Sequence, residues 1–174
     1  QAFRTTLHRL RKLLHHDAAV QLADRHLSLD PSLVSLDHAA FEAKALTVDR
    51  TDSVALEQTL ALYRGHFLHG ETAPWIFPVR ERLRALFLSL TEQLGILLEE
   101  RGEVGEATQQ YLRALEVEPI AEVMCRKVMM TYVRLGRRSE AIGVYQRFNQ
   151  ALQTKLGVPP TSETVSLYHD ITKS

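Results

Sequence analysis

Residues 94–119 read LGILLEERGEVGEATQQYLRALEVEP, and this stretch decides the fold. Two apolar segments at helical spacing flank Gly102, which suits a reversal of the chain. Gly95 and Ala107 are small, so the two helices can cross closely at these positions, and Pro119 ends the second helix. The stretch therefore predicts a tight antiparallel pair of helices, with Tyr111 packing onto the neighbouring pair.

The same order of residue types returns 34 residues later. Gly136, Ala141 and Tyr145 follow Gly102, Ala107 and Tyr111 at that interval. A period of 34 is typical of tetratricopeptide repeats, in which each repeat is one helix–turn–helix unit. The second copy has Met129 at the position of Gly95. Two stacked helix pairs are therefore expected.

Further helices are expected on both sides of the repeats. Apolar residues at helical spacing follow these candidate N-caps: Asp37 for one helix, Thr51 or Ser53 for the next, and Thr161 or Ser162 for a last helix that covers the end of the stack. Residues 65–78 are rich in glycine and proline and predict a structured connection. Trp75, the only tryptophan, is expected to fill the core beneath it.

The first residues predict an amphipathic helix with a cationic side. Phe3, Leu7, Leu10 and Leu14 form one apolar stripe at helical spacing. The opposite face carries Thr5, His8, Arg9 and Lys12, with Arg11 on its flank. Residues 19–29 then predict a small β-hairpin, and residues 33–36 predict a third extended segment.

Composition excludes several classes of protein. The 174 residues are 45% hydrophobic and 24% charged, which is typical of a globular protein. No stretch is apolar for long enough to span a membrane, and a single cysteine excludes an internal disulfide, so a reducing cytoplasmic location is expected. The net charge is zero, but residues 1–26 hold five Lys/Arg against two Asp. This asymmetry points to a nucleic-acid-facing segment at the N-terminal end.

From about residue 37 to 172 the chain resembles the bacterial transcriptional activator domain, the helical module of the Streptomyces antibiotic regulatory proteins. The resemblance rests on an ordered set of segments: Tyr63-Arg64-Gly65-x-Phe67-Leu68, Trp75 with Arg80 and Leu83, the two repeats, and Leu156-Gly157-Val158-Pro159-Pro160. Residues 37–174 are accordingly expected to form this domain. The resemblance implies dimerisation and contact with the transcription machinery.

Upstream, Thr6 to Leu14 resembles the recognition helix of winged helix-turn-helix domains of the OmpR type. Residues 1–36 are then expected to be the C-terminal part of such a domain, namely the recognition helix and the wing, in a fragment of a longer regulator. Arg25 and the residues after it stand where that family usually carries a Gly-Tyr pair. The resemblance places these residues at the DNA: Arg9 on a base, His8 and Arg11 on phosphates with Lys12 as an added point charge, Thr5 on a base edge or a thymine methyl, and Arg25 or His26 at the wing tip.

The sequence thus predicts a mostly α fold, a TPR-like helical array with an N-terminal recognition-type helix and a small β-hairpin. The expected function is transcriptional regulation, with DNA bound through the parent protein. Arginines on the array are candidates for a protein partner such as RNA polymerase, another regulator domain or a second copy: Arg80, Arg84, Arg134, Arg137 and Arg138. Two alternatives stay open, a protein-interaction scaffold without a DNA role and a ligand-sensing module with a pocket near Trp75.

No enzyme motif is found in the sequence. It contains no Walker-type glycine loop, no Gly-x-Ser-x-Gly and no His-Glu-x-x-His, so neither catalysis nor a cofactor is expected. His66 and His69 have no second pair of ligands nearby in sequence, and a metal site is not expected there. Cys125 lies among Met124, Val128 and Met129 and is expected to be a small core residue.

Overall fold

The computed structural model describes residues 2–24 and 26–173. These residues form eight α-helices, one short 3-10 helix and one two-stranded sheet, so the predicted mostly α fold is confirmed. The chain divides into two compact units, an N-terminal unit (Gln1–Ala40) and a C-terminal unit (Phe41–Ser174). Arg25, predicted at the wing tip, lies outside the described residues. No helix among the described residues is long and apolar enough to cross a membrane.

The N-terminal unit is a helix followed by a hairpin. The helix α1 spans Ala2–Leu13, the 3-10 helix η1 spans Asp17–Ala19, and the strands β1 and β2 span Val20–Ala23 and His26–Leu29. The strands pair antiparallel, with Val20 opposite Leu29, which confirms the predicted hairpin. Leu7 of α1 and Val20 of β1 are buried within this unit.

Residues 33–36 do not form the predicted third extended segment. The backbone N–H groups of Leu33 and Val34 both donate to the carbonyl oxygen of Asp30, and the Asp30 carboxylate accepts bonds from the N–H and hydroxyl of Ser32. Pro31, with its fixed φ, suits the second position of a turn. Local side-chain and turn bonds therefore replace strand pairing here.

Two shorter helices open the array, α2 (Asp37–Thr47) and α3 (Ser53–Leu60). The N-cap of α3 is Asp52 and not Thr51 or Ser53, because its carboxylate accepts bonds from the N–H groups of Val54 and Ala55. Phe41, Tyr63 and Phe87 stack in sequence, with ring centroids 5.1 and 4.4 Å apart. This aromatic column joins α2 to the long helix that follows.

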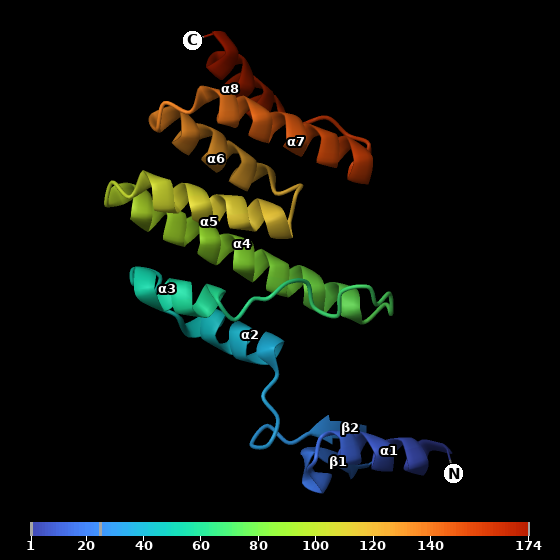
Figure 1. Cartoon of the computed structure of the whole chain (residues 1–174). Coiled ribbons are helices and arrows are strands. Elements are labelled where there is room, and N and C mark those ends of the chain that lie inside the picture. Colours follow the sequence, from blue (N-terminus) through green and yellow to red (C-terminus); the bar gives the residue numbers. More distant parts are fainter. Residues whose placement is uncertain (1, 25, 174) are drawn as a thin grey trace. The chain divides into compact units, whose positions relative to one another are not determined.

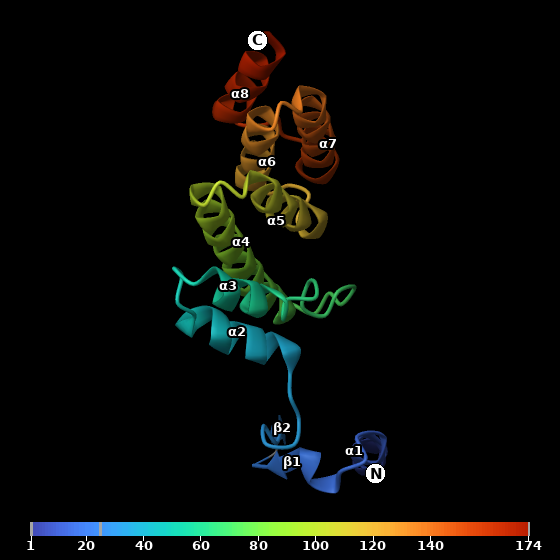
Figure 2. The ribbon, with the colours of Figure 1, turned by 60° about the vertical axis from the view of Figure 1, so that its left-hand side comes forward.

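Four helices build the predicted repeats: α4 (Ile76–Glu100), α5 (Val104–Val117), α6 (Glu122–Arg134) and α7 (Arg138–Leu156). Each packs against the next, and Figures 1 and 2 show them as two successive antiparallel pairs. Gly102 and Gly136 have φ of 79° and 71°, a left-handed conformation that favours glycine, at the reversals between paired helices. The two-repeat prediction is confirmed.

The contact between Gly95 and Tyr111 sets the crossing of α4 and α5. A Cβ atom on Gly95 would lie 2.2 Å from the Tyr111 ring, so only glycine permits this approach. The Tyr111 hydroxyl donates to Glu99 Oε1 at 2.8 Å, and burial, together with this carboxylate, raises the pKa of Tyr111. Tyr111 therefore packs on Gly95 within its own helix pair, and Lys127 of the neighbouring helix α6 lies 5.9 Å from the centre of its ring.

In the second repeat the equivalent tyrosine, Tyr145, makes a different contact. Met129 occupies the position equivalent to Gly95 and is fully buried, which leaves no space for a ring. Tyr145 instead stacks on Tyr168 of the last helix, α8 (Ser162–Lys173), with ring centroids 4.0 Å apart. With methionine at this repeat position, Tyr145 packs on α8. The helix α8 packs on α6 and α7 as expected.

The sequence predicts that Cys125 and Trp75 lie in the core, and the structure confirms this for Cys125 alone. Cys125 is fully buried beside Met129, as predicted, and burial raises the pKa of its thiol to about 12. Trp75 is 61% exposed and lies edge-on to the Phe67 ring, with ring centroids 6.3 Å apart, so its prediction as a core residue is wrong. The core next to this connection is already filled by Tyr63 and Phe87.

Replacing Gly95 by alanine tests the crossing. Gly95→Ala is expected to lower the free energy of unfolding by about 1–3 kcal/mol, because the new methyl group overlaps a buried ring. The measurement is urea unfolding followed by circular dichroism. The matched control is Gly105→Ala in α5, where a Cβ atom meets nothing within 4 Å. The control is expected to be neutral or to stabilise by up to about 1 kcal/mol, and equal losses in the two variants would contradict the proposed crossing.

Candidate nucleic-acid and partner interfaces

The candidate DNA-facing residues of α1 lie on one exposed face. Thr5, His8, Arg9 and Lys12 follow the spacing of one helix face and all are exposed. Within the described residues, the side chains of His8, Arg9 and Lys12 make no hydrogen bond or ion pair, and α1 contains no acidic residue. Arg4, which the sequence reasoning did not select, is a further exposed cation one turn before His8. The face therefore carries uncompensated positive charge.

Arg11 has a different position from the other cations of α1. Its Nε and Nη2 donate to the carbonyl oxygen of Val20 at 3.1 and 2.8 Å, and the side chain is half-buried. Two bonds from one guanidinium fix the orientation of a neighbouring segment more firmly than one point charge would. Arg11 therefore holds the hairpin against α1.

The apolar stripe of α1 is only partly covered. Leu7 is buried, whereas Phe3 is 53% exposed and Leu10 and Leu14 are exposed as well. A helix of 12 residues is about 18 Å long, whereas a four-residue strand spans about 13 Å. The hairpin is too short to cover the whole stripe, so the predicted core face is open apart from Leu7.

On the array, Arg80 is engaged inside the protein. Its guanidinium donates to the carbonyl oxygens of Phe67, Leu68 and Glu71, at 3.0, 2.7 and 3.2 Å. These three acceptors belong to the connection between α3 and α4, where Leu68 has an unusual φ of 45°. Arg80, predicted as a partner-binding residue, therefore fixes the shape of this connection.

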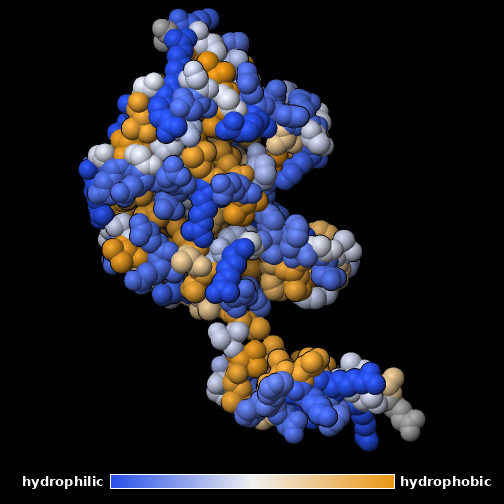
Figure 3. All heavy atoms as spheres, viewed as in Figure 1, coloured by the Kyte–Doolittle hydropathy of each residue, from blue (hydrophilic) through white to orange (hydrophobic). Residues whose placement is uncertain are grey.

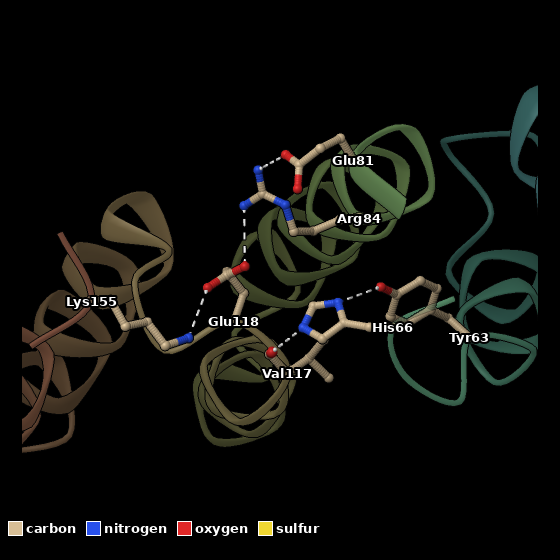
Figure 4. Close-up of polar contacts among 7 residues, drawn as sticks. All are labelled: Tyr63, His66, Glu81, Arg84, Val117, Glu118 and Lys155. Atoms are coloured by element: carbon tan, nitrogen blue, oxygen red, sulfur yellow. Dashed lines mark hydrogen bonds and ion pairs between the residues drawn. The ribbon is translucent and has the colours of Figure 1, made fainter. Parts of the chain in front are cut away.

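Arg84 belongs to a charged cluster that joins three helices (Figure 4). It binds Glu81 on α4 and Glu118 at the end of α5, with N–O distances of 2.6 and 3.3 Å, and Lys155 of α7 approaches the same Glu118 at 3.7 Å. Glu118 is only 7% exposed. Because a buried carboxylate needs compensating partners, the two cations stabilise its position between the helix pairs.

His66 joins the connection to the same end of α5 (Figure 4). Its Nε2 lies 3.1 Å from the carbonyl oxygen of Val117, and its Nδ1 lies 3.5 Å from the Tyr63 hydroxyl. The rings of His66 and His69 stack with centroids 6.3 Å apart. In the part of the chain that is described, no group of three His, Cys, Asp or Glu residues is arranged to hold a metal ion.

The arginines near the Gly136 turn differ in the ion pairs that they form within the chain. Arg134 pairs with Glu99 of α4, and Arg137 pairs with Glu140 while lying 4.8 Å from the centre of the Tyr132 ring. Arg138 is exposed and makes no hydrogen bond or ion pair with the described residues. Of the predicted partner-binding arginines, Arg138 is therefore the one whose donors are open to another molecule.

Neutralising Glu118 tests the charged cluster. Glu118→Gln is expected to lower the free energy of unfolding by about 1–3 kcal/mol, because Arg84 and Lys155 lose a buried carboxylate partner. Thermal or urea unfolding measures the difference. Glu116→Gln, the same change two residues earlier at an exposed position, is the control and should change stability by less than about 0.5 kcal/mol. If the two variants unfold alike, the cluster does not tie the helix pairs together.

Comparison with known proteins is consistent with this architecture. Residues 32–172 match the family model described as the bacterial transcriptional activator domain. No curated protein matches the chain. Among solved structures, Mycobacterium tuberculosis EmbR in complex with a low-affinity phosphopeptide aligns with a TM-score of 0.58 and 19% identity, over 99% of this chain and 49% of that one. At this identity the likeness shows the fold alone, and the chain spans about half the length of EmbR.

Proposed function

The chain belongs to the bacterial transcriptional activator domain family, a family of regulators and not of enzymes, and on this premise we propose that it acts in sequence-specific transcriptional regulation. Residues 1–36 form the recognition helix and wing of a winged helix-turn-helix domain of the OmpR type. Residues 37–174 form the activator module, which contacts protein partners. The regulator works in the cytoplasm, where its DNA lies.

One observation carries the DNA-binding part of the proposal, namely the uncompensated charge of α1. His8, Arg9 and Lys12 are exposed without a partner among the described residues. In contrast, Arg80, Arg84 and most arginines of the array are bound to carbonyl or carboxylate oxygens of the chain. Phosphates supply most of the affinity of such surfaces, because Lys and Arg release counterions from DNA. The open cations of α1 suit that role.

Within α1 the residues have separate tasks. Arg9 reads a guanine, whose O6 and N7 match the guanidinium fork, and Thr5 lies on the same face to contact a base edge. His8 and Lys12 contact phosphates and fix the register of the helix in the major groove. Arg11 both holds the hairpin, through its bonds to Val20, and keeps one Nη for a phosphate.

The array supplies the protein contacts. Arg138 has no partner among the described residues and Arg134 and Arg137 are about half exposed, so the Gly136 turn offers a cationic surface to an acidic partner. Beside it, a groove of about 580 Å³ lies between α6 and α8, lined by Met130, Val133 and Leu167 among others. Its occupant is RNA polymerase, another domain of the regulator or a second copy of the chain. Arg80 and Arg84 contribute by holding the array in shape.

The regular stack of α4 to α7 also favours a second candidate, a protein-interaction scaffold without a DNA role, because stacked helix pairs present extended binding surfaces. The two candidates differ in whether α1 binds duplex DNA. Trp75 is exposed and does not line the groove between α6 and α8, and nothing among the described residues favours a ligand-sensing pocket at Trp75.

Two substitutions in α1 separate base reading from phosphate contact. Lys12→Ala is expected to weaken binding to all duplexes and to reduce the slope of log affinity against log salt by about 0.9. Arg9→Ala is expected to relax sequence preference, since a good base contact discriminates by about 1–3 kcal/mol. The measurement is fluorescence anisotropy on the protein at its full natural length, using a duplex that the wild type selects from a random library and a scrambled duplex.

The control for both variants is Arg64→Ala, which removes an exposed, unpaired arginine from the connection before α4. DNA binding by this variant should match the wild type. If Arg64→Ala weakens binding as much as Lys12→Ala, the effect is one of total charge. If neither α1 variant changes binding, α1 is not the recognition helix and the scaffold candidate stands.

A further inference from the structure

We propose that the groove between α5 and α7 binds an extended, acidic peptide segment of a protein partner. This site belongs to the C-terminal unit and its lining does not include the residues of the Gly136 turn, so it goes beyond the proposed contacts of the regulator. The groove has a suitable shape, and within the described part of the chain two of its arginines have no carboxylate partner and two of its amide side chains make no hydrogen bond.

The groove has the size and the floor of a peptide site. Figure 2 shows α5 and α7 on one side of the array, with α4, α6 and α8 on the other. The hollow between α5 and α7 measures about 620 Å³, within the range of about 300–1,000 Å³ for ligand sites. Its apolar lining comes from Leu112, Leu115, Pro119, Val144 and Phe148. Hydrophobic atoms show in the band between α7 and α5 in Figure 3, with hydrophilic side chains on either side.

Two arginines line the groove, one from each helix. Arg147 of α7 makes no hydrogen bond or ion pair with the described residues. Arg113 of α5 makes one bond, from Nη2 to the carbonyl oxygen of Leu60 at 3.3 Å, and has no carboxylate partner. Glu116 is the one acidic residue lining the groove, so its net charge is positive. Two open guanidinium groups beside an apolar floor are complementary to a carboxylate that neighbours an apolar side chain.

Two neighbouring amides suit a peptide main chain. Gln109 and Gln110 line the groove, and neither side chain makes a hydrogen bond with the described residues. A glutamine amide offers both a donor and an acceptor, which is the pair that an extended main chain presents. A nucleic acid fits less well, because its continuous phosphates would meet the carboxylate of Glu116. The chemistry of the groove therefore favours an extended segment with Asp or Glu and apolar residues.

The test uses the full 174-residue chain and three fluorescein-labelled hexapeptides of alternating Asp and Leu, Lys and Leu, or Asn and Leu. Fluorescence anisotropy should show saturable binding of the Asp–Leu peptide, at least about tenfold tighter than that of either other peptide. Arg147→Gln should weaken this binding by about tenfold. Arg64→Gln, which removes an exposed arginine outside the groove and leaves the same net charge, should leave it unchanged.

Two further measurements distinguish this occupant from others. An Asp–Leu peptide with N-methylated amides keeps its carboxylates but loses main-chain donors, and it should bind at least about tenfold more weakly if the glutamines read the main chain. Sedimentation velocity of wild type and Arg147→Gln should show the same oligomeric state. The proposal is overturned if the Asp–Leu and Lys–Leu peptides bind equally well, or if Arg147→Gln binds the Asp–Leu peptide as tightly as the wild type. A changed oligomeric state of Arg147→Gln would also overturn it, because a second copy of the chain would then cover the groove.

Discussion

The ring of Tyr111 lying on the bare backbone of Gly95 is the contact on which the array depends. It brings α5 so close to α4 that the Tyr111 hydroxyl reaches Glu99, which in turn binds Arg134 of α6. The absence of a side chain at Gly95 thereby sets the spacing of α4, α5 and α6. In the second pair, Met129 fills the same position and Tyr145 stacks on Tyr168 of α8.

This packing also decides which charges remain open to other molecules. Arg80 shapes the connection before α4, Arg84 supports the buried carboxylate of Glu118, and Arg134 binds Glu99. Arginines in such positions stabilise the fold more than they attract partners. Among the described residues, the cations without a partner include those on the exposed face of α1, Arg64, Arg138 and Arg147. The functional proposals follow this distribution and not the positions of basic residues in the sequence alone.

Local and periodic features were predictable from the sequence, whereas long-range contacts were not. The 34-residue spacing and the glycines at 102 and 136 predict both helix pairs, because each turn needs a left-handed residue. The exposure of Trp75 depends on whether other rings fill the core beside it, which no local pattern reveals. The roles of Arg11 and Arg80 depend on carbonyl groups that only the fold brings near. Arg113 and Arg147 belong to no motif and share a groove only because α5 and α7 lie side by side.

In the proposed regulator, α1 holds the DNA and the helical array contacts proteins. Photo-cross-linking tests it most directly, with a photoreactive residue placed at position 8 or at position 138 of the full natural protein bound to duplex DNA. Both positions are exposed, and the native side chains have no partner among the described residues. The account predicts a cross-link to DNA from position 8 and none from position 138. Cross-links from position 138 with none from position 8 would contradict it.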